Sequence, residues 1–137
     1  MNATTAIAAK GKVTSVKEGM VVFCPTDTNY ELHLVTSKFD GPVGRPVKCV
    51  IRVVAKKVLT VPSGGNFIVP IFGPPRIVQG RVRAIEGNTI VVQAGAPVYV
   101  ELPWEESAID QDEGPIAVGK MVNVLCQPGA KGEFEKP

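Results

Sequence analysis

The chain has 137 residues and a formal net charge of +2, with 45% hydrophobic, 20% charged and 6% aromatic residues. This composition excludes a disordered chain and predicts a globular protein with an aliphatic core. Fourteen glycines and twelve prolines argue against long helices and favour many short strands, and the single histidine argues against multi-histidine metal sites and most histidine-based triads.

Three widely spaced cysteines, Cys24, Cys49 and Cys126, lie in apolar runs without a C-x-x-C pair. This pattern indicates buried thiols in a reducing compartment rather than a zinc or redox site. No apolar run approaches the roughly 18 to 20 residues that span a bilayer, and residues 1–10 lack the basic start and apolar centre of a signal peptide. We therefore expect a cytoplasmic protein with no membrane partner.

Four sequence blocks recur in the same order, which predicts an internal duplication. The alternative is two β-rich stretches that share turn chemistry. The paired blocks are residues 11–16 and 80–85, 21–23 and 90–92, 40–43 and 113–116, and 44–50 and 119–125. At the offset of 69 residues that relates the first two pairs of blocks, Tyr30 falls on Tyr99.

Each copy is expected to form a meander of short strands joined by turns that contain glycine or asparagine. In chain order the predicted strands are 12–17, 20–24, 29–35, 46–55 with an open continuation through 58–61, then 78–85, 89–93, 98–102 and 121–126. Val47, Cys49, Ile51 and Val53 alternate with outward positions, which is typical of a strand with one buried face. Residues 103–113 allow at most a short helix, because a proline is followed by acidic residues.

The predicted organisation is all-β: two duplicated small barrels packed into one compact unit. The first repeat is assigned to 10–61, a Gly/Pro-bounded connector with an extra strand at 66–72 to 62–76, the second repeat to 77–128, and a polar tail to 129–137. The Gly-x-Val openings and the Gly-Lys/Arg-x-Val fourth strands resemble OB-fold and SH3-like barrels at the level of the fold, with no specific family implied. We expect the extra strand to pack against the second repeat; an exposed apolar arm between chains is the alternative.

Basic residues on the predicted strand faces indicate one candidate function, which is the binding of single-stranded DNA or RNA. The candidate residues are Lys12, Lys48, Arg52, Lys56, Arg81 and Arg83. Few aromatic residues are present to stack on bases, and lysines on strand faces also prevent edge-to-edge pairing. Solvated strand faces therefore explain the same residues without any nucleic acid.

Other features favour a non-enzymatic interaction or assembly module, self-association included. Residues 1–75 carry nine basic and four acidic residues, whereas residues 76–137 carry six and nine, and such opposite charge can steer contact between chains. The candidate interaction residues are Phe67, Ile68, Ile71, Phe72, Trp104, Glu105, Glu106 and Asp112. The acidic cluster lacks the spacing of a calcium loop, and His33 is interpreted as an outward structural residue. We predict no catalytic site, metal, cofactor or small-molecule ligand, and a partner that is this chain itself or another protein.

Overall fold

The computed structural model describes residues 7–36 and 39–134. Residues 1–6, 37–38 and 135–137 lie outside the described residues. The first of these ranges holds most of the N-terminal stretch in which no signal peptide is expected, and the last holds the end of the predicted polar tail. The described residues form an all-β protein in which twelve strands belong to one connected sheet. The short helix allowed between 103 and 113 is a 3-10 turn at Glu106–Ala108.

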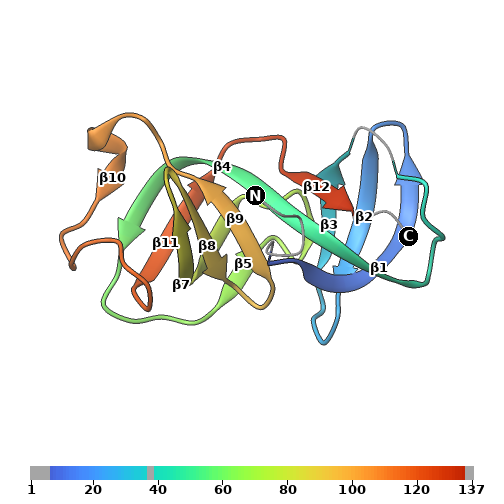
Figure 1. The fold of residues 1–137 in the computed structure, drawn as a ribbon, viewed down its shortest axis with the longest axis horizontal. Helices are drawn as coiled ribbons and strands as arrows, with labels where there is room; N and C mark the ends of the chain where they lie inside the picture. The colour runs from blue at the N-terminus through green and yellow to red at the C-terminus, as the bar shows by residue number, and fades with distance from the viewer. Residues whose placement is uncertain (1–6, 37–38, 135–137) are drawn as a thin grey trace.

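The strands follow the predicted meanders closely. They are β1 (Ala9–Lys17), β2 (Met20–Pro25), β3 (Glu31–Val35), β4 (Pro46–Thr60), β5 (Phe67–Val69), β6 (Phe72–Gly73), β7 (Ile77–Glu86), β8 (Thr89–Gln93), β9 (Pro97–Glu101), β10 (Ile109–Asp110), β11 (Met121–Cys126) and β12 (Lys131–Phe134). The open continuation of the fourth strand is real, because β4 runs without interruption for 15 residues. In Figure 1 this strand crosses the middle of an elongated molecule.

The pairing of strands closes into a ring at one end of the molecule. β1 pairs with β2, β2 with β3, β3 with β12, β12 with β4, and β4 with β1. We call these five strands the first ring, to which β4 contributes residues 46–52. A ring of five strands is compatible with a small barrel-like fold.

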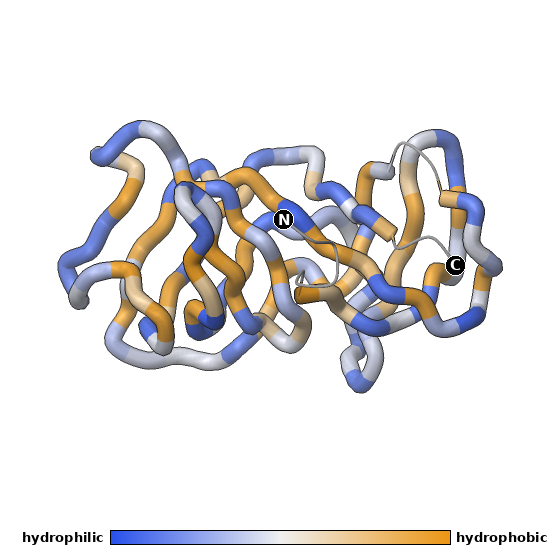
Figure 2. The backbone as a smooth tube through the Cα atoms, viewed as in Figure 1, coloured by the Kyte–Doolittle hydropathy of each residue, from blue (hydrophilic) through white to orange (hydrophobic). Residues whose placement is uncertain are grey.

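Residues 51–60 of β4 take part in a second closed path of pairing, and two of them, Ile51 and Arg52, also pair with β12 in the first ring. β4 pairs in parallel with β9, β9 pairs with β8, β8 with β7, β7 with β11, and β11 returns to β4. We call these five strands the second ring. One hydrophobic cluster runs through both rings and includes Phe23, Leu34 and Ile51 as well as Val92 and Val124. Figure 2 shows hydrophobic residues along the strands of both ends and hydrophilic residues at most of the outer turns.

Cys49, Ile51 and Val53 are at most 3% exposed and Val47 is half-buried, as the predicted alternation along β4 requires. Val50, at an outward position of this alternation, is nevertheless also buried, because it packs in a second small cluster with Val91 and Tyr99. The register against β11 shifts between Leu125 and Cys126, where residue 56 has no partner. Such a bulge adds one residue to a strand and changes which side chains point inward. Ala55 and Val58 are consequently both buried, three residues apart.

The C-terminal segment differs from the predicted polar tail, because Lys131–Phe134 form β12. Gly132 lies in the first ring, where a Cβ atom would come within 3.1 Å of the Cys49 sulfur and of a Leu34 methyl carbon. Phe134 packs edge-to-face on Phe23 and Phe39. The segment looks polar in the sequence because one of its two inward positions is a glycine, so that Phe134 stands alone among polar and charged residues.

The connector forms two short strands instead of the single one expected at 66–72. β5 pairs with β7, which agrees with packing against the second repeat, whereas β6 pairs in parallel with β3 of the first ring. Pro70 separates the two strands, because proline lacks the amide hydrogen that a continuous strand would use. Ile68 is 1% exposed, so it belongs to the core and not to an interaction surface.

Two glycines hold the same position in the first strand of each ring. A Cβ atom at Gly11 would lie 2.3 Å from the carbonyl oxygen of Cys24, and one at Gly80 would lie 2.0 Å from that of Gln93. Both distances are far inside van der Waals contact, so an alanine would force the neighbouring strands apart.

We expect Gly80→Ala to lower the free energy of unfolding by about 3 kcal/mol, as severe overpacking does. Gly65→Ala is the matched control, because an added Cβ atom would have its nearest contact with a Phe67 ring carbon at 3.9 Å, and it should change stability by less than about 0.5 kcal/mol. Urea unfolding of both variants measures the difference. Equal midpoints would mean that β7 and β8 do not approach as closely as described.

Candidate binding surface

The outer face of β2 and β3 carries apolar side chains that the alternation of both strands turns away from the core. Val21 and Leu34 point inward and are at most 1% exposed. Their neighbours Met20 and Val22 therefore point outward, Met20 opposite Val35 and Val22 opposite His33. These outward positions form two adjacent rows on the surface of the first ring.

Phe72 extends this surface from the connector. β6 pairs with β3 so that Phe72 lies opposite Glu31, and its ring meets the His33 ring edge-to-face at 4.6 Å between centroids. Phe72 is nevertheless 62% exposed, and Val35 is 44% exposed. We call Met20, Val22, His33, Val35 and Phe72 the β3 patch.

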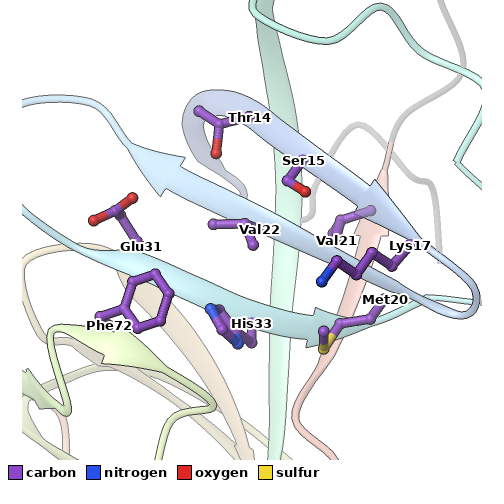
Figure 3. A pocket seen from close by; sticks show the side chains of 9 residues that line it. All are labelled: Thr14, Ser15, Lys17, Met20, Val21, Val22, Glu31, His33 and Phe72. Atoms are coloured by element: carbon purple, nitrogen blue, oxygen red, sulfur yellow. The ribbon is translucent and has the colours of Figure 1, made fainter.

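A pocket of about 240 Å³ opens on the β3 patch, and Figure 3 shows the side chains around it. Strand β1 supplies the other side of the pocket, where the register shifts between Val13 and Ser15. The lining residues outside the patch are Thr14, Ser15, Lys17, Val21 and Glu31. The volume is below the roughly 300–1,000 Å³ of sites for drug-sized ligands, so it suits a single side chain better than a cofactor.

His33 contributes an unsatisfied polar atom to this surface. Its Nε2 is buried and has no hydrogen-bond partner among the described residues. Buried polar atoms without a partner are uncommon and mark places where an additional group would be stabilised. Sequence reasoning placed His33 outward on a strand and gave it only a structural role.

Three of the basic residues predicted to bind nucleic acid have partners within the chain. Arg52 lies 2.9 Å from a Glu133 carboxylate oxygen, and its guanidinium carbon lies 4.8 Å from the centre of the Tyr99 ring. Arg81 donates to the carbonyl oxygen of Gly119, and Arg83 donates to the side chain of Gln93. These contacts position the side chains along the sheet surface.

Of the remaining candidates, Lys12 and Lys48 lie close together, where Lys10, which is not a predicted site residue, joins them, and Lys56 lies apart. Lys10 lies directly opposite Lys48 across β1 and β4, and Lys12 follows two residues later on β1. All three side chains are exposed on the first ring. Lys56 occupies the unpaired position beside β11, so the face that Lys48, Arg52 and Lys56 were predicted to share is interrupted at the bulge.

The predicted interaction residues occupy two separate places. Ile71 and Phe72 are exposed beside β3, and Phe67 is half-buried. Trp104 is 88% exposed in the loop before the 3-10 turn, near the second part of β4, and so belongs to a different surface. Its acidic neighbours are also exposed; they are Glu105, Glu106 and Asp112.

Neither a metal centre nor a membrane-spanning helix is found in the part of the chain that the structure describes. Among residues 7–36 and 39–134, no group of three or more His, Cys, Asp or Glu side chains could hold a metal ion. Within the same residues no helix has the length and apolarity needed to cross a bilayer.

The three thiols differ in their surroundings. Cys49 and Cys126 are buried, and desolvation raises the pKa of each thiol to about 12. Cys24 is half-buried, and its sulfur lies 3.8 Å from the Thr14 hydroxyl on the outer face of the first ring. The prediction of buried thiols therefore holds for two of these three residues.

Comparison with protein-family models, with curated protein sequences and with solved structures finds no match to this chain.

We expect one cysteine, Cys24, to react with a thiol reagent in the native protein at pH 8, whereas three react after denaturation. The thiolate is the reactive form, and burial both raises the pKa of Cys49 and Cys126 and blocks access to them. A spectrophotometric thiol count with and without denaturant measures this. Rapid labelling of Cys49 or Cys126 in the native protein would contradict the burial of β4 or β11.

Proposed function

We propose that this protein is a non-enzymatic interaction module that binds another protein through the β3 patch. The observation that carries the proposal is the exposure of Phe72 and Val35, 62% and 44%, on the outer face beside a pocket. Removing apolar surface from water stabilises a complex by roughly 25 cal/mol per Å², and contiguous apolar patches often mark interaction sites.

We further propose that the chain is two duplicated small barrels of the OB type. The order of strands supports this, because in each ring the first three form a meander and the third pairs in parallel with a fifth. The registers agree as well: Gly11 lies opposite Val47 in the first ring, and Gly80 lies opposite Val122 in the second. Gly44 and Gly119 each donate a backbone hydrogen bond to the first strand of their ring.

The barrel proposal is consistent with the location of the β3 patch. OB folds bind oligonucleotides and oligosaccharides over the face of their second and third strands, so the analogy supports the location of a site and not the class of its ligand. In the first ring these strands are β2 and β3, which carry most of the patch. The location of the site on β2 and β3 is supported by the likeness to OB folds, whereas a protein partner is supported by the apolar side chains of the β3 patch.

The protein partner can also be a second copy of this chain, in which case the protein self-associates. The exposed Trp104 and its acidic neighbours would then meet the basic first ring of the other copy. Opposite charges on different surfaces favour a head-to-tail contact rather than a two-fold symmetric one.

A peptide library displayed on phage, selected against the full chain, tests the interaction proposal. We expect selected clones to bind the double variant Val22→Lys, Phe72→Ser at least tenfold more weakly, because the charge and the lost ring remove the apolar contact. Val118→Lys is the matched control, since Val118 is 67% exposed elsewhere, and it should bind as the unchanged chain does. Failure to enrich clones, or clones that bind all three proteins equally, would refute the proposal. Light scattering on the same proteins reports association between copies.

Binding of single-stranded DNA or RNA is the second candidate function, and the group of Lys10, Lys12 and Lys48 favours it. Phosphate contacts release counterions, so such binding should fall steeply as salt rises. If this function is correct, Lys12→Glu with Lys48→Glu should abolish most of the affinity for a labelled oligonucleotide in fluorescence anisotropy. Lys57→Glu with Arg76→Glu, which changes the charge equally elsewhere, should have a smaller effect. Equal effects of the two pairs would indicate general electrostatic attraction without a site.

A further inference from the structure

The two rings carry corresponding surfaces on the outer faces of their second and third strands. Val22 lies opposite His33 between β2 and β3, and Val91 lies opposite Tyr99 between β8 and β9. The register of the first two strands shifts at the same place in both rings, before Ser15 and before Ala84. The corresponding pairs are Ser15 and Ala84, Val22 and Val91, and His33 and Tyr99.

This register corrects one detail of the sequence comparison. At a constant offset Tyr30 falls on Tyr99, but the strand pairing makes His33 the residue that corresponds to Tyr99. The reason is that the stretch between the paired residues of the second and third strands is three residues longer in the first ring than in the second. An imidazole and a phenol therefore occupy the same place on the two surfaces.

In the second ring this surface is covered by a segment of the chain itself. Ile7 and Ala8 pack against a small cluster of Val50, Val91 and Tyr99. The backbone N–H of Ile7 donates a hydrogen bond of 2.8 Å to the Tyr99 hydroxyl. Val91 and Tyr99 are only 1% and 3% exposed, and the Arg52 guanidinium, 4.8 Å from the centre of the Tyr99 ring, also covers the phenol.

In the first ring the corresponding surface is the pocket on the β3 patch. Ser15, Val22 and His33 line it and are half-buried. Phe72 forms a wall of this pocket and remains 62% exposed, so it does not fill the place that Ile7 fills in the second ring. Figure 3 shows the Phe72 ring beside His33, with Val22 on the neighbouring strand.

We propose that the pocket of the first ring binds an extended aliphatic segment of another protein, as the second ring holds Ile7 and Ala8. The inference deepens the proposed function, on which it rests, by naming the chemistry of the partner. An aliphatic side chain enters beside Val22 and Ser15. A pocket whose rim carries one lysine and one glutamate, Lys17 and Glu31, gives no net preference for a charged segment.

The unpartnered Nε2 of His33 corresponds to the Tyr99 hydroxyl of the second ring. In the tautomer protonated at Nδ1, Nε2 accepts a hydrogen bond, as the Tyr99 hydroxyl does from Ile7. This atom is buried in the unbound protein, and the Phe72 ring lies edge-to-face on the imidazole, so the proposal includes a rotation of the Phe72 side chain that opens a path to Nε2. A backbone N–H of the segment then satisfies the buried acceptor.

Titration of the ¹⁵N-labelled full chain with a capped peptide of the sequence of residues 5–10, Thr-Ala-Ile-Ala-Ala-Lys, tests this inference. We expect saturable NMR shift changes at the amides of Ser15, Val22, His33 and Phe72, with a dissociation constant on the order of 1 mM for so short a ligand. The same peptide with aspartate in place of isoleucine should produce no saturable change. Shifts at Val91 and Tyr99 instead, or no saturable shifts, would overturn the inference.

Variants of the pocket separate the contributions. Ser15→Leu fills the pocket from β1 and should weaken peptide binding at least tenfold. Val22→Lys should weaken it by a similar factor, so that one variant still tests the pocket if the other does not fold. His33→Phe keeps the ring but removes the acceptor, so it should weaken binding about fivefold. Val118→Lys is the control and should leave the affinity unchanged. Full affinity in both Ser15→Leu and Val22→Lys would overturn the inference.

The peptide titration and the phage selection can fail separately, so together they distinguish failure of this inference from failure of the proposed function. Clones that depend on the β3 patch, together with a peptide that does not bind, would reject the aliphatic segment and leave the interaction module standing. Absence of patch-dependent clones would reject the proposed function itself.

Discussion

The architecture depends on β4, because this strand supplies hydrogen bonds to both rings. Its first part pairs with β1 and β12, and its later part pairs with β9 and β11. A strand of 15 residues at about 3.3 Å per residue extends close to 50 Å, which is long for a chain of this size. The bulge at residue 56 lets one strand present Ile51 and Val53 and then Ala55 and Val58 to the shared core.

Sharing β4 has a consequence for the way in which the rings close. The chain leaves the first ring along β4 before that ring is complete, and the missing strand arrives last, as β12. The second ring is closed by the later part of β4, which precedes its own first strand in the sequence. Each ring therefore needs a strand from beyond its own meander, and a core that runs through both is the expected result. Unfolding of one ring should expose the edge of the other.

The sequence predicts most of the local elements and the packing of the connector strand against the second repeat, but it leaves open how the two repeats share their other strands. The run of Val47, Cys49, Ile51 and Val53 defines a half-buried strand without any knowledge of its neighbours. The same run does not say which strands lie beside it, since pairing partners are chosen by contacts far along the chain. The sequence does not reveal β12, because Gly132 fills one of its inward positions and leaves Phe134 as an isolated apolar residue, and it gives the connector as one strand although Pro70 divides it.

The candidate site was only partly predictable for a related reason. Exposed Phe72 was identified from the apolar connector, whereas Val22 and Ser15 looked like ordinary strand residues. Alternation alone could have placed Met20, Val22 and His33 on one face, because Val21 and Leu34 are strongly apolar neighbours. It could not have shown that the corresponding face of the second ring is covered by Ile7, since that comparison requires the register.

Under the proposed duplication, the same face would have started with the same properties in both copies and then diverged. In the second ring a phenol replaces the imidazole, and the chain provides its own aliphatic segment, so the face has become part of the fold. In the first ring the stretch before β3 is three residues longer, β6 borders the face, and the acceptor on His33 remains unsatisfied. A surface that needs an apolar cover for stability would be covered permanently within one chain. Under the proposed function, the first ring keeps this face bordered only by the exposed Phe72 ring, so that an aliphatic segment of a partner supplies the cover that Ile7 supplies in the second ring.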